Sequence, residues 1–540
     1  MGYAEQRGKL WRARWKLPSG KLDGMSGFLT QKAARNYAND QEAKIRAGNY
    51  VDPRAGQILV NTWIDTWFRS LDLEESTLEN YRFLLETCVR PFFAERTLAS
   101  LSAEEINEWE RDLVKVYDYS KATAKAARSR LGTALAAAVP SRIPTNPAAR
   151  PRASGKRADR RVQRVLQKRR AYATPLEIVL IAERLGIMAG PAVFVQTVFA
   201  GFTGARWSEI LGTAPDCVRG AELDLDWKLY ELNGHFYRGR PKDGSIRTID
   251  VPPFLQSLLQ RHLEDEATTT RCTCSEDAPE PYCSGGQYVF LGPDGGHPRR
   301  STFSRRFLRP AADGAYPGQR GKPATPVVAS LAASWPGLPL PASGSFRGFQ
   351  PGQARASGVN SRSTRAALVE YGVAQGTSVE ELAGLTREQL LDRFVRSAYV
   401  SRDSALVSWL PIMRGLTMHG FRHGHETMMA EDRIAEALRD ERMGHIGDGT
   451  MRAHYTHVTD PMRGELLEAL QRRWETALME RVELERHWGG VMPAGSALPL
   501  LEELLQPFRD AAVSKIGSHF APKIGQRRER KRPIPVRIGL

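Results

Sequence analysis

The runs His419-Gly-Phe-Arg422-His, Gly444-His445 and Tyr455-Thr-His-Val decide how this chain is interpreted. They place two histidines, an arginine and a tyrosine at fixed intervals. Arginine matches phosphate with paired, charge-assisted hydrogen bonds, and histidine exchanges protons near neutral pH. A phenol is a nucleophile once it is activated locally. The combination indicates a site that acts on a phosphate ester.

A second arginine stands far upstream, in the run Thr203-Gly-Ala-Arg206-Trp-Ser-Glu209. We expect Arg206 to open a helix, which puts Glu209 one turn further on, where a carboxylate can orient the guanidinium group. Arg206 and Arg422 are therefore candidates for a clamp that stabilises the extra negative charge of a pentavalent phosphate. The alternative for any arginine in so basic a chain is an ordinary surface position.

The residues quoted above resemble the tyrosine recombinase (phage integrase) family, whose box runs His-x-x-Arg, Gly-His, Tyr. The resemblance also implies a lysine on a mobile β-hairpin that protonates the leaving 5′-oxygen. Lys242, in the run Arg240-Pro-Lys242-Asp-Gly244, fits this place, with Arg240 and Lys228 as rivals. The implied catalytic residues are Arg206, Lys242, His419, Arg422, His445 and Tyr455, with Glu209 as the supporting carboxylate.

By the same resemblance, the chain is expected to be a site-specific DNA recombinase that integrates and excises a phage or other mobile element. The tyrosine would form a 3′-phosphotyrosyl link and free a 5′-hydroxyl, and strands would be exchanged through a Holliday junction held by a homotetramer. The covalent link stores the energy of the broken bond, so no cofactor is required for catalysis. The expected partners are double-stranded DNA attachment sites and an excisionase or DNA-bending factor.

Two other functions remain open on the sequence. A type IB topoisomerase shares this chemistry but relaxes supercoils without exchanging partners, and a separate N-terminal DNA-binding domain argues against it. A DNA-binding regulator derived from a recombinase would have no turnover. The filled catalytic positions argue against a regulator, although they do not prove catalysis.

The composition agrees with a DNA-binding protein. The 540 residues carry 77 Lys and Arg against 61 Asp and Glu, a net charge of +16, which suggests a polyanionic partner, most simply nucleic acid. No apolar run reaches the roughly 18 residues of a membrane helix. The five cysteines are scattered unevenly, which argues against a disulfide framework. We therefore expect a cytoplasmic, nucleoid-associated protein without a membrane partner.

The predicted fold is mainly α-helical and multidomain, with small β-sheets. The expected parts are an arm-type DNA-binding domain with a β-sheet plus a helix (1–55), a helical SAM-like core-binding domain (56–145), a basic interdomain linker (146–173), an α+β catalytic domain of the tyrosine recombinase type (174–475) with an insertion at about 310–405, and a C-terminal helix with a basic tail (476–540). The names of these domains come from the resemblance, whereas their bounds come from composition and local patterns.

Bulky and basic residues alternate from Lys9 to Leu17, as a strand requires, and a turn and a second strand follow. Arg12, Arg14 and Lys16 are therefore candidate DNA contacts. The alternative is a plain sheet whose tryptophans form a small core. Thr30 is expected to cap a helix that runs to about residue 45.

Other local signals place helices and turns. Ser76 and Ser102 each precede a glutamate by three residues and are expected to cap helices, as is Thr174 before Pro175. Asn233-Gly234 predicts a tight hairpin. Residues 310–352 are expected to be poorly ordered because proline and glycine crowd there, and residues 380–395 to be helical. A basic stripe on an Ala-rich helix is by itself typical of a solvated face, but the similarity of this segment to the core-binding domain of integrases implies contact with DNA; the stripe consists of Lys121, Lys125, Arg128 and Arg130.

Three cysteines depart from the family's minimal pattern. Cys272, Cys274 and Cys283 lie on a loop, with His262 upstream. Three thiolates and an imidazole can hold Zn²⁺ tetrahedrally, so these residues are candidates for a structural zinc site, with His297 as the alternative fourth ligand. The other interpretation is a loop with free cysteines. Histidines also crowd the region after residue 419, but without carboxylate or thiol partners at a recognised ligand spacing.

Overall fold

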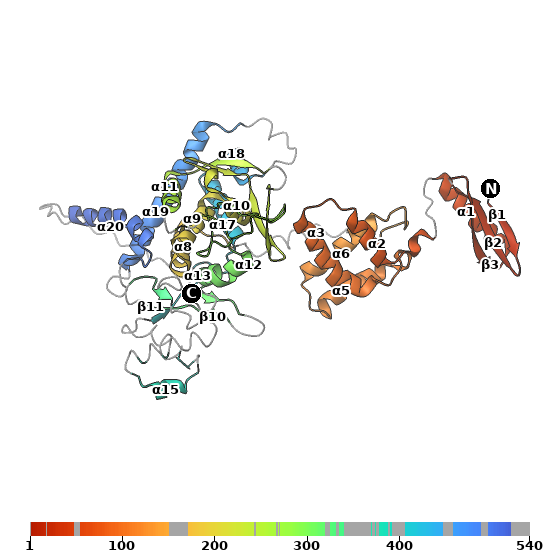
Figure 1. Ribbon diagram of the computed structural model, residues 1–540, viewed down its shortest axis with the longest axis horizontal. Coiled ribbons are helices and arrows are strands. Elements are labelled where there is room, and N and C mark those ends of the chain that lie inside the picture. Colours follow the sequence, from red (N-terminus) through yellow and green to blue (C-terminus); the bar gives the residue numbers. More distant parts are fainter. Residues whose placement is uncertain are drawn as a thin grey trace, which may run out of the picture. The chain divides into compact units, whose positions relative to one another are not determined.

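The computed structural model divides the chain into two compact units, Met1–Gln167 and Lys168–Leu540 (Figure 1). The residues that it describes are 2–17, 19–47, 54–150, 171–241, 245–265, 268, 270–318, 324–330, 334–339, 369, 373, 377–386, 389–390, 406–445, 457–487 and 495–519. Each unit is mainly helical with small antiparallel sheets, as predicted. None of the helices in these ranges combines the length and the hydrophobicity needed to cross a membrane.

The chain begins with a three-stranded antiparallel sheet and one helix. The strands β1 (Tyr3–Arg7), β2 (Leu10–Lys16) and β3 (Leu22–Phe28) pair in this order, and α1 (Gln31–Arg46) follows. The Thr30 hydroxyl accepts a hydrogen bond from the N–H of Ala33 (3.2 Å), as predicted for a helix cap. β1 was not predicted, because Tyr3-Ala-Glu-Gln-Arg7 lacks an alternating apolar pattern.

The two faces of this sheet differ in character. Ala13 and Trp15 of β2 are buried in a small core against α1. Because side chains alternate along a strand, Arg12, Arg14 and Lys16 lie on the opposite face. Trp15 is thus a core residue, and the three basic residues share the face that α1 leaves uncovered.

Residues 54–150 form a helical bundle around a second core. Its helices are α2 (Val60–Arg69), α3 (Glu75–Leu84), α4 (Arg90–Phe93), α5 (Ala103–Lys115) and α6 (Lys121–Ala136), with a π-helical turn (Leu85–Val89) that joins α3 to α4. The Ser102 hydroxyl caps α5 by accepting from the N–H of Glu105 (3.1 Å). Ser76 does not cap α3, which begins one residue earlier with Glu74 at the cap position.

The predicted basic stripe on α6 is divided by burial. Lys121 and Lys125 are exposed, but Arg128 is buried and donates hydrogen bonds to the side chain of Asn107 and the carbonyl of Ala148. Arg130 stacks on a tyrosine ring. Only the two lysines therefore remain in the position expected for contact with DNA, since the arginines stabilise the bundle.

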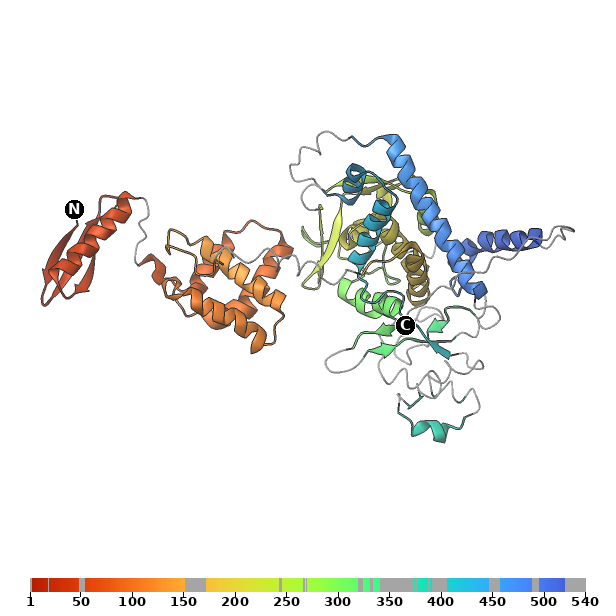
Figure 2. The ribbon, with the colours of Figure 1, turned by 180° about the vertical axis from the view of Figure 1, so that it is seen from behind.

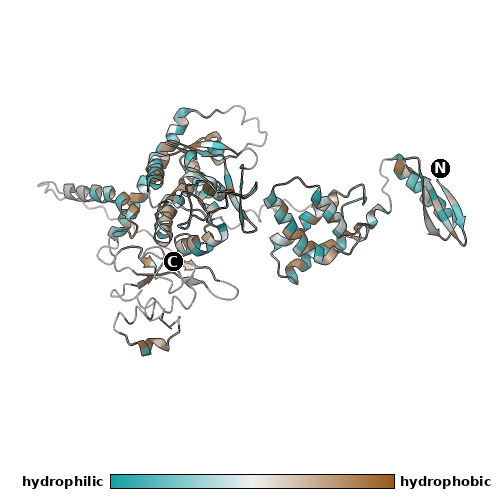
Figure 3. Ribbon diagram, viewed as in Figure 1, coloured by the Kyte–Doolittle hydropathy of each residue, from teal (hydrophilic) through white to brown (hydrophobic). Residues whose placement is uncertain are grey.

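The second unit is built around two apolar helices, α8 (Pro175–Ala189) and α9 (Pro191–Thr203). Thr174 and Glu177 form a complete capping box at the start of α8, as predicted. Figures 1 and 2 show these helices at the centre of the unit, with α19 (Asp460–His487) along one side and α11 (Pro253–Glu264) beside it. In Figure 3, hydrophobic residues mark these central helices, whereas the N-terminal strands are mostly hydrophilic.

Two small sheets and three further helices surround the central helices and position the candidate site. One sheet has the order β4-β5-β8 and the other is the hairpin β6-β7, whose turn is Asn233-Gly234, as predicted. The elements are β4 (Val218–Arg219), β5 (Glu222–Leu225), β6 (Lys228–Leu232), β7 (His235–Gly239), β8 (Arg247–Asp250), α10 (Trp207–Gly212), α17 (Met418–Glu431) and α18 (Glu436–Met443).

For the residues between 310 and 352 that the structure describes (310–318, 324–330 and 334–339), the prediction of poor order is wrong. Ala311 and Ala312 are buried in the main core, on α13 (Arg309–Asp313). Short strands follow and pair as β9-β10 and β12-β11-β13; they are β9 (Ala315–Tyr316), β10 (Thr325–Pro326), β11 (Val328–Ser330), β12 (Leu338–Pro339) and β13 (Leu406–Ser408). Where a helix is predicted at 380–395, the structure has α15 (Val379–Ala383), and residues 387–388 and 391–395 lie outside the described residues.

The C-terminal end of the expected catalytic domain also differs from the prediction. The boundary at residue 475 falls inside α19, which continues to His487. Leu478 on that helix and Leu501 and Leu505 on α20 (Pro499–His519) belong to the same core as α8 and α9. The basic tail lies outside the described residues.

A buried ion-pair network fastens α19 to α8 and α20. Arg481 is fully buried and donates two hydrogen bonds to the carboxylate of Glu183 on α8, at 2.8 and 2.9 Å. It also donates to Glu485 (2.8 Å), which in turn accepts from Arg509 on α20 (2.9 Å). These bonds satisfy charges that would be costly to bury alone.

Replacing Arg481 with leucine should therefore lower the free energy of unfolding by about 3–5 kcal/mol, because Glu183 is left as a buried, unpaired charge. Urea denaturation measures the change. The matched control is Arg472→Leu, on the same helix but in an exposed pair with Glu468, which should change stability by roughly 0.5 kcal/mol or less. Equal effects of the two substitutions would contradict the role given to the network.

Candidate functional site

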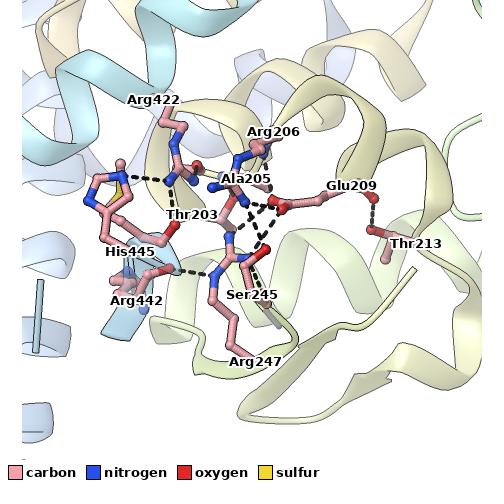
Figure 4. A network of polar contacts seen from close by, with 12 residues as sticks. Thr203, Ala205, Arg206, Glu209, Thr213, Ser245, Arg247, Arg422, Arg442 and His445 are labelled. Atoms are coloured by element: carbon pink, nitrogen blue, oxygen red, sulfur yellow. Dashed lines mark hydrogen bonds and ion pairs between the residues drawn. The ribbon is translucent and has the colours of Figure 1, made fainter. Parts of the chain in front are cut away.

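The predicted arginines meet where three segments of the second unit converge (Figure 4). Arg206 caps α10 and lies two residues after Gly204, which ends α9 with a positive φ of 68°. A Cβ on that glycine would lie 2.7 Å from the ring of His425, so the turn requires glycine for both its conformation and its space. Arg422 comes from α17, and His445 follows α18.

Glu209 is the centre of the cluster and is 1% exposed. Its carboxylate accepts hydrogen bonds from the backbone N–H of Arg206 (2.8 Å) and from its Nη1 (2.7 Å), so the predicted contact is present. Arg247 on β8 donates to the same carboxylate from Nη1 (3.2 Å) and Nη2 (3.0 Å). Burial alone would raise the pKa of the Glu209 carboxyl, but the bonds from Arg247 and Arg206 hold it below its usual range. It is therefore ionised at neutral pH.

Arg422 is buried and held by main-chain acceptors. Its Nη1 donates to the carbonyl of Gly204 (2.8 Å) and its Nη2 to the carbonyl of Met443. The same Nη2 lies 3.2 Å from Nε2 of His445. Burial, together with the positive charge of Arg206, lowers the pKa of Arg422 to about 10. The guanidinium thus stays charged at neutral pH and is held rigidly.

The histidine of the Gly-His run lies at the open side of the cluster. Since a guanidinium only donates, His445 accepts from Arg422 at Nε2, which places the ring proton of a neutral imidazole on Nδ1. Nδ1 faces Asp440 at 3.7 Å. The side chain of His445 is 51% exposed and that of Arg206 is 36% exposed, whereas Arg422 lies beneath them. A phosphate in solution therefore has access to Arg206 and His445.

The cluster carries more positive than negative charge. Among the described residues, Glu209 is the one carboxylate that pairs with the guanidinium groups of Arg206 and Arg247, and Arg422 donates instead to main-chain carbonyls and to His445. A fourth guanidinium, that of Arg442, is buried close by, and its Nε donates to His425 (2.9 Å). Such an excess of fixed cations is favourable where an anion binds. The arrangement can hold a phosphate and stabilise additional negative charge on it.

Sequence reasoning missed Arg247, Ser245 and Arg442. Ser245 accepts a hydrogen bond from Nη1 of Arg206 (3.3 Å), and the carbonyl of Arg442 accepts from Nε of Arg247 (2.7 Å). These residues connect β8 and α18 to the start of α10. No local signal in the sequence marks them, because each contact spans many residues of the chain.

His425 has a structural role that the cluster of histidines in the sequence did not reveal. It is completely buried, and its pKa lies well below the usual range because of burial and the adjacent charge of Arg442. The ring is therefore neutral and accepts from the arginine. Among the described residues, the group that could hold a metal ion lies elsewhere, at the cysteine loop.

The remaining predicted catalytic residues are placed only in part. His419 is exposed on α17, one turn before Arg422, and its ring contacts that of His423 edge to face (centroids 4.5 Å apart). Lys242 and Tyr455 lie outside the described residues. The chain leaves the described part after Pro241 and returns at Ser245; it leaves again after His445 and returns at His457.

The two rivals of Lys242 have other partners. Arg240 pairs with the carboxylate of Asp226 (2.7 Å) and stacks over the ring of Trp227 (3.8 Å). The ammonium group of Lys228 lies 5.5 Å from the ring of Tyr230 on the same strand. These contacts favour Lys242 over both residues, and its role stays a prediction.

The predicted zinc ligands require one correction. Cys272, Cys274 and Cys283 lie together with His297, the alternative fourth ligand. His262 lies instead on α11, where its Nε2 is 2.8 Å from the carbonyl of Val289 and its ring stacks on an aromatic neighbour. His297 therefore replaces His262 in the candidate ligand set.

Comparison with known proteins gives matches at the level of structure. No protein-family model and no curated protein matches the sequence. The Tn1549 transposon integrase in complex with transposon right end DNA is 14% identical, with a TM-score of 0.42 over 79% of this chain and 100% of that chain. A lambda integrase tetramer bound to a Holliday junction is 16% identical, with a TM-score of 0.39 over 85% and 97%. What this chain does is therefore inferred from its own residues.

Proposed function

We propose that this chain is a site-specific DNA recombinase of the tyrosine recombinase type. The observation that carries the proposal is the cluster in which Arg206 and Arg247 pair with the carboxylate of Glu209 and Arg422 bonds to His445, with Arg206 and His445 exposed to solvent. The excess positive charge is suited to a phosphate of the DNA backbone. The net charge of +16 on the whole chain favours the same partner.

In the proposed reaction, Arg206 and Arg422 hold the two non-bridging oxygens of the scissile phosphate. Their guanidinium groups are already fixed by Glu209 and by the carbonyls of Gly204 and Met443, so little reorganisation is needed as charge develops. Arg247 holds Glu209 from the other side and acts as a positioning residue. The clamp is thus formed before the substrate binds.

The nucleophile of the proposed reaction is Tyr455. Its phenolic oxygen attacks the phosphorus, the bond from phosphorus to the 5′-oxygen breaks, and a 3′-phosphotyrosyl link and a free 5′-hydroxyl result. His419 takes the phenolic proton, His445 contacts the phosphate, and Lys242 supplies a proton to the leaving oxygen. The segments that carry Lys242 and Tyr455 each have one end in the cluster, at Ser245 and at His445. This connectivity supports the assignment.

The covalent link retains the energy of the phosphodiester bond, so a 5′-hydroxyl of a partner strand can reverse the attack. We propose that four protomers exchange strands in this way through a Holliday junction, and that the reaction integrates and excises a mobile element. The basic face formed by Arg12, Arg14 and Lys16 would bind DNA outside the crossover region. An excisionase or bending factor would set the direction.

A nicked suicide substrate tests the proposal. Binding sites are first selected from random duplex DNA with the full-length protein, and a selected site is then built into a duplex with a nick close to the cleavage position. Loss of the short leaving strand traps the covalent complex, which is expected as an SDS-resistant adduct that forms in the presence of EDTA. Specific binding without an adduct would favour a regulator. Relaxation of unrelated supercoiled plasmid without strand exchange would favour a topoisomerase.

A shortened chain tests the division of labour between the two ends. A fragment that begins at Arg54 keeps the pairing of Ile58 and Val60 with the loop near Leu98 and thus the core of the helical bundle. It should still form the adduct at a core site. It should fail to protect the outer bases that the full-length protein protects from nuclease, and the salt dependence of its binding should be weaker because phosphate contacts are lost.

The matched variant keeps the whole chain and changes only the basic face, as Arg12→Ala, Arg14→Ala and Lys16→Ala together. It should give the footprint of the fragment, since the small core of Ala13 and Trp15 is untouched. If full-length protein, fragment and triple variant all protect the same bases, the sheet has no role in binding DNA.

A further inference from the structure

We propose that Cys272, Cys274, Cys283 and His297 bind a structural Zn²⁺ ion that fixes the loop packed on the β6-β7 hairpin. One ligand atom from each of these four side chains lies within 4.8 Å of all the others. Cys272, Cys283 and His297 are buried and Cys274 is half-buried. The proposal concerns a site separate from the arginine cluster and does not depend on the proposed reaction.

The distances agree with a tetrahedral site. With Zn–S bonds near 2.3 Å and a Zn–N bond near 2.0 Å, neighbouring ligand atoms lie roughly 3.5–3.8 Å apart. In this structure the sulfur atoms of Cys272 and Cys283 are 3.9 Å apart, and Sγ of Cys283 is 3.6 Å from Nε2 of His297. An ion between these atoms therefore requires only small adjustments of the side chains.

The described part of the loop is held by backbone hydrogen bonds and a small apolar cluster rather than by regular secondary structure. Between α11, which ends at Glu264, and α12 (Arg300–Phe303), the described residues form isolated bridges but no helix or strand. Segments of this length without secondary structure are uncommon in compact domains, and metal ions are a frequent means of stabilising small irregular regions. The four ligands lie at the start, middle and end of residues 272–297, so one ion would close the loop at three points.

The surroundings of the ligands suit a metal site. The hydroxyl of Tyr288 lies 3.3 Å from the sulfur of Cys283, where it can donate a hydrogen bond to a thiolate. Cys274, Cys283 and His297 are among the residues that line a cavity of about 840 Å³. The alternative is that these cysteines are free thiols packed in a small core. The zinc content of the purified protein distinguishes a metal site from such a core.

The bound ion would also brace the hairpin that precedes Lys242. The backbone N–H of Cys283 donates to the carbonyl of Phe236 (2.7 Å), and the N–H of Arg238 donates to the carbonyl of Pro281 (2.9 Å). The ring of His297 packs against that of Phe236 (centroids 4.9 Å apart). The loop is thus bonded to and packed on β7, and the segment that carries Lys242 follows this strand.

Elemental analysis of full-length protein, prepared reduced and without chelator, tests the site. About one zinc per chain is expected. Cys283→Ser and His297→Gln should lose the metal. The matched controls Cys217→Ser, a buried cysteine outside the loop, and His262→Gln, the histidine that the structure separates from the thiols, should retain it. Zinc absent from the wild type, or retained in full by Cys283→Ser, would overturn the proposal.

A second measurement covers the case in which the variants fail to fold. Removing the metal from the wild type with a strong chelator should make residues 270–298 sensitive to protease, and added Zn²⁺ should restore resistance. Co²⁺ in place of Zn²⁺ should give the visible absorption of a tetrahedral site with thiolate ligands. Protease resistance unchanged by the chelator, or a mass that shows Cys272 and Cys283 joined as a disulfide, would count against a metal site.

Discussion

Tyr455→Phe is expected to abolish covalent capture of DNA on the nicked suicide substrate while specific binding stays at the wild-type level. The substitution removes only the phenolic oxygen, and the arginine cluster that holds the phosphate remains. Loss of the nucleophile in a covalent enzyme lowers the rate by roughly 10⁴- to 10⁶-fold. Denaturing gels measure the adduct, and an electrophoretic shift of the same DNA measures binding.

A peptide map makes this test independent of any failure to fold. After trypsin digestion of the wild-type adduct, the nucleotide should remain on the peptide Ala453–Arg463, which contains Tyr455. The control is Tyr172→Phe, an exposed tyrosine of the same unit, which should leave the adduct unchanged. An adduct that persists in Tyr455→Phe, or that maps to another peptide, would show that a different side chain attacks.

The sequence predicts those parts of the site whose residues are close together in the chain or belong to the motif of the family that it resembles. The contact between Arg206 and Glu209 follows from a separation of three residues at the start of a helix, and the structure has it at 2.7 Å. Arg422 and His445 were chosen by a motif, and they meet at 3.2 Å. Lys242 and Tyr455 rest on the same motif and stay predictions.

What the sequence does not predict depends on contacts between distant segments. Arg247 is a single arginine in an alternating strand, and only the fold brings it to Glu209. The choice between His262 and His297 is decided by which way each ring faces, and spacing along the chain does not determine this. Arg128 shows the same limit, because a basic residue on a helix is either a surface contact or a buried anchor according to its neighbours.

The fold was predicted best where the pattern is strong. The capping box at Thr174, the cap at Ser102 and the turn at Asn233-Gly234 are confirmed, since each is a short-range arrangement of the backbone. The cap at Ser76 is wrong because α3 begins at Glu75, so Ser76 lies inside the helix. The boundary at residue 475 is wrong because the apolar stripe of α19 continues and packs on the same core.

The arginine cluster explains why the two clamp residues should not tolerate lysine. Arg422 reaches the carbonyl of Gly204, the carbonyl of Met443 and Nε2 of His445 at the same time, and it does so with two separate nitrogen atoms. A lysine has one nitrogen and a less defined direction, so it cannot make these contacts and also hold a phosphate oxygen. Charge alone therefore does not replace the guanidinium group.

Arg422→Lys is accordingly expected to lower the rate of cleavage by roughly 10³-fold, the scale for loss of one fixed donor to a developing negative charge. Burial lowers the pKa of Arg422 to about 10, which leaves the wild-type group charged between pH 7 and pH 9. A lysine has a lower pKa in water than arginine, and the same burial lowers it further. The residual activity of the variant should fall as pH rises, because the charged form is lost, whereas this group contributes no such fall in the wild type.

Single-turnover cleavage of the suicide substrate at several pH values measures both effects. Arg472→Lys, in an exposed ion pair on α19, is the control for the substitution itself and should match the wild type. A thermal melt checks that Arg422→Lys is folded, and binding of the uncleaved duplex checks that it still recognises DNA. A threefold difference in rate corresponds to roughly 0.7 kcal/mol in activation free energy. If Arg422→Lys cleaves within about threefold of the wild-type rate, the buried guanidinium is not part of the phosphate clamp. Its contacts with Gly204 and Met443 would then serve the fold alone.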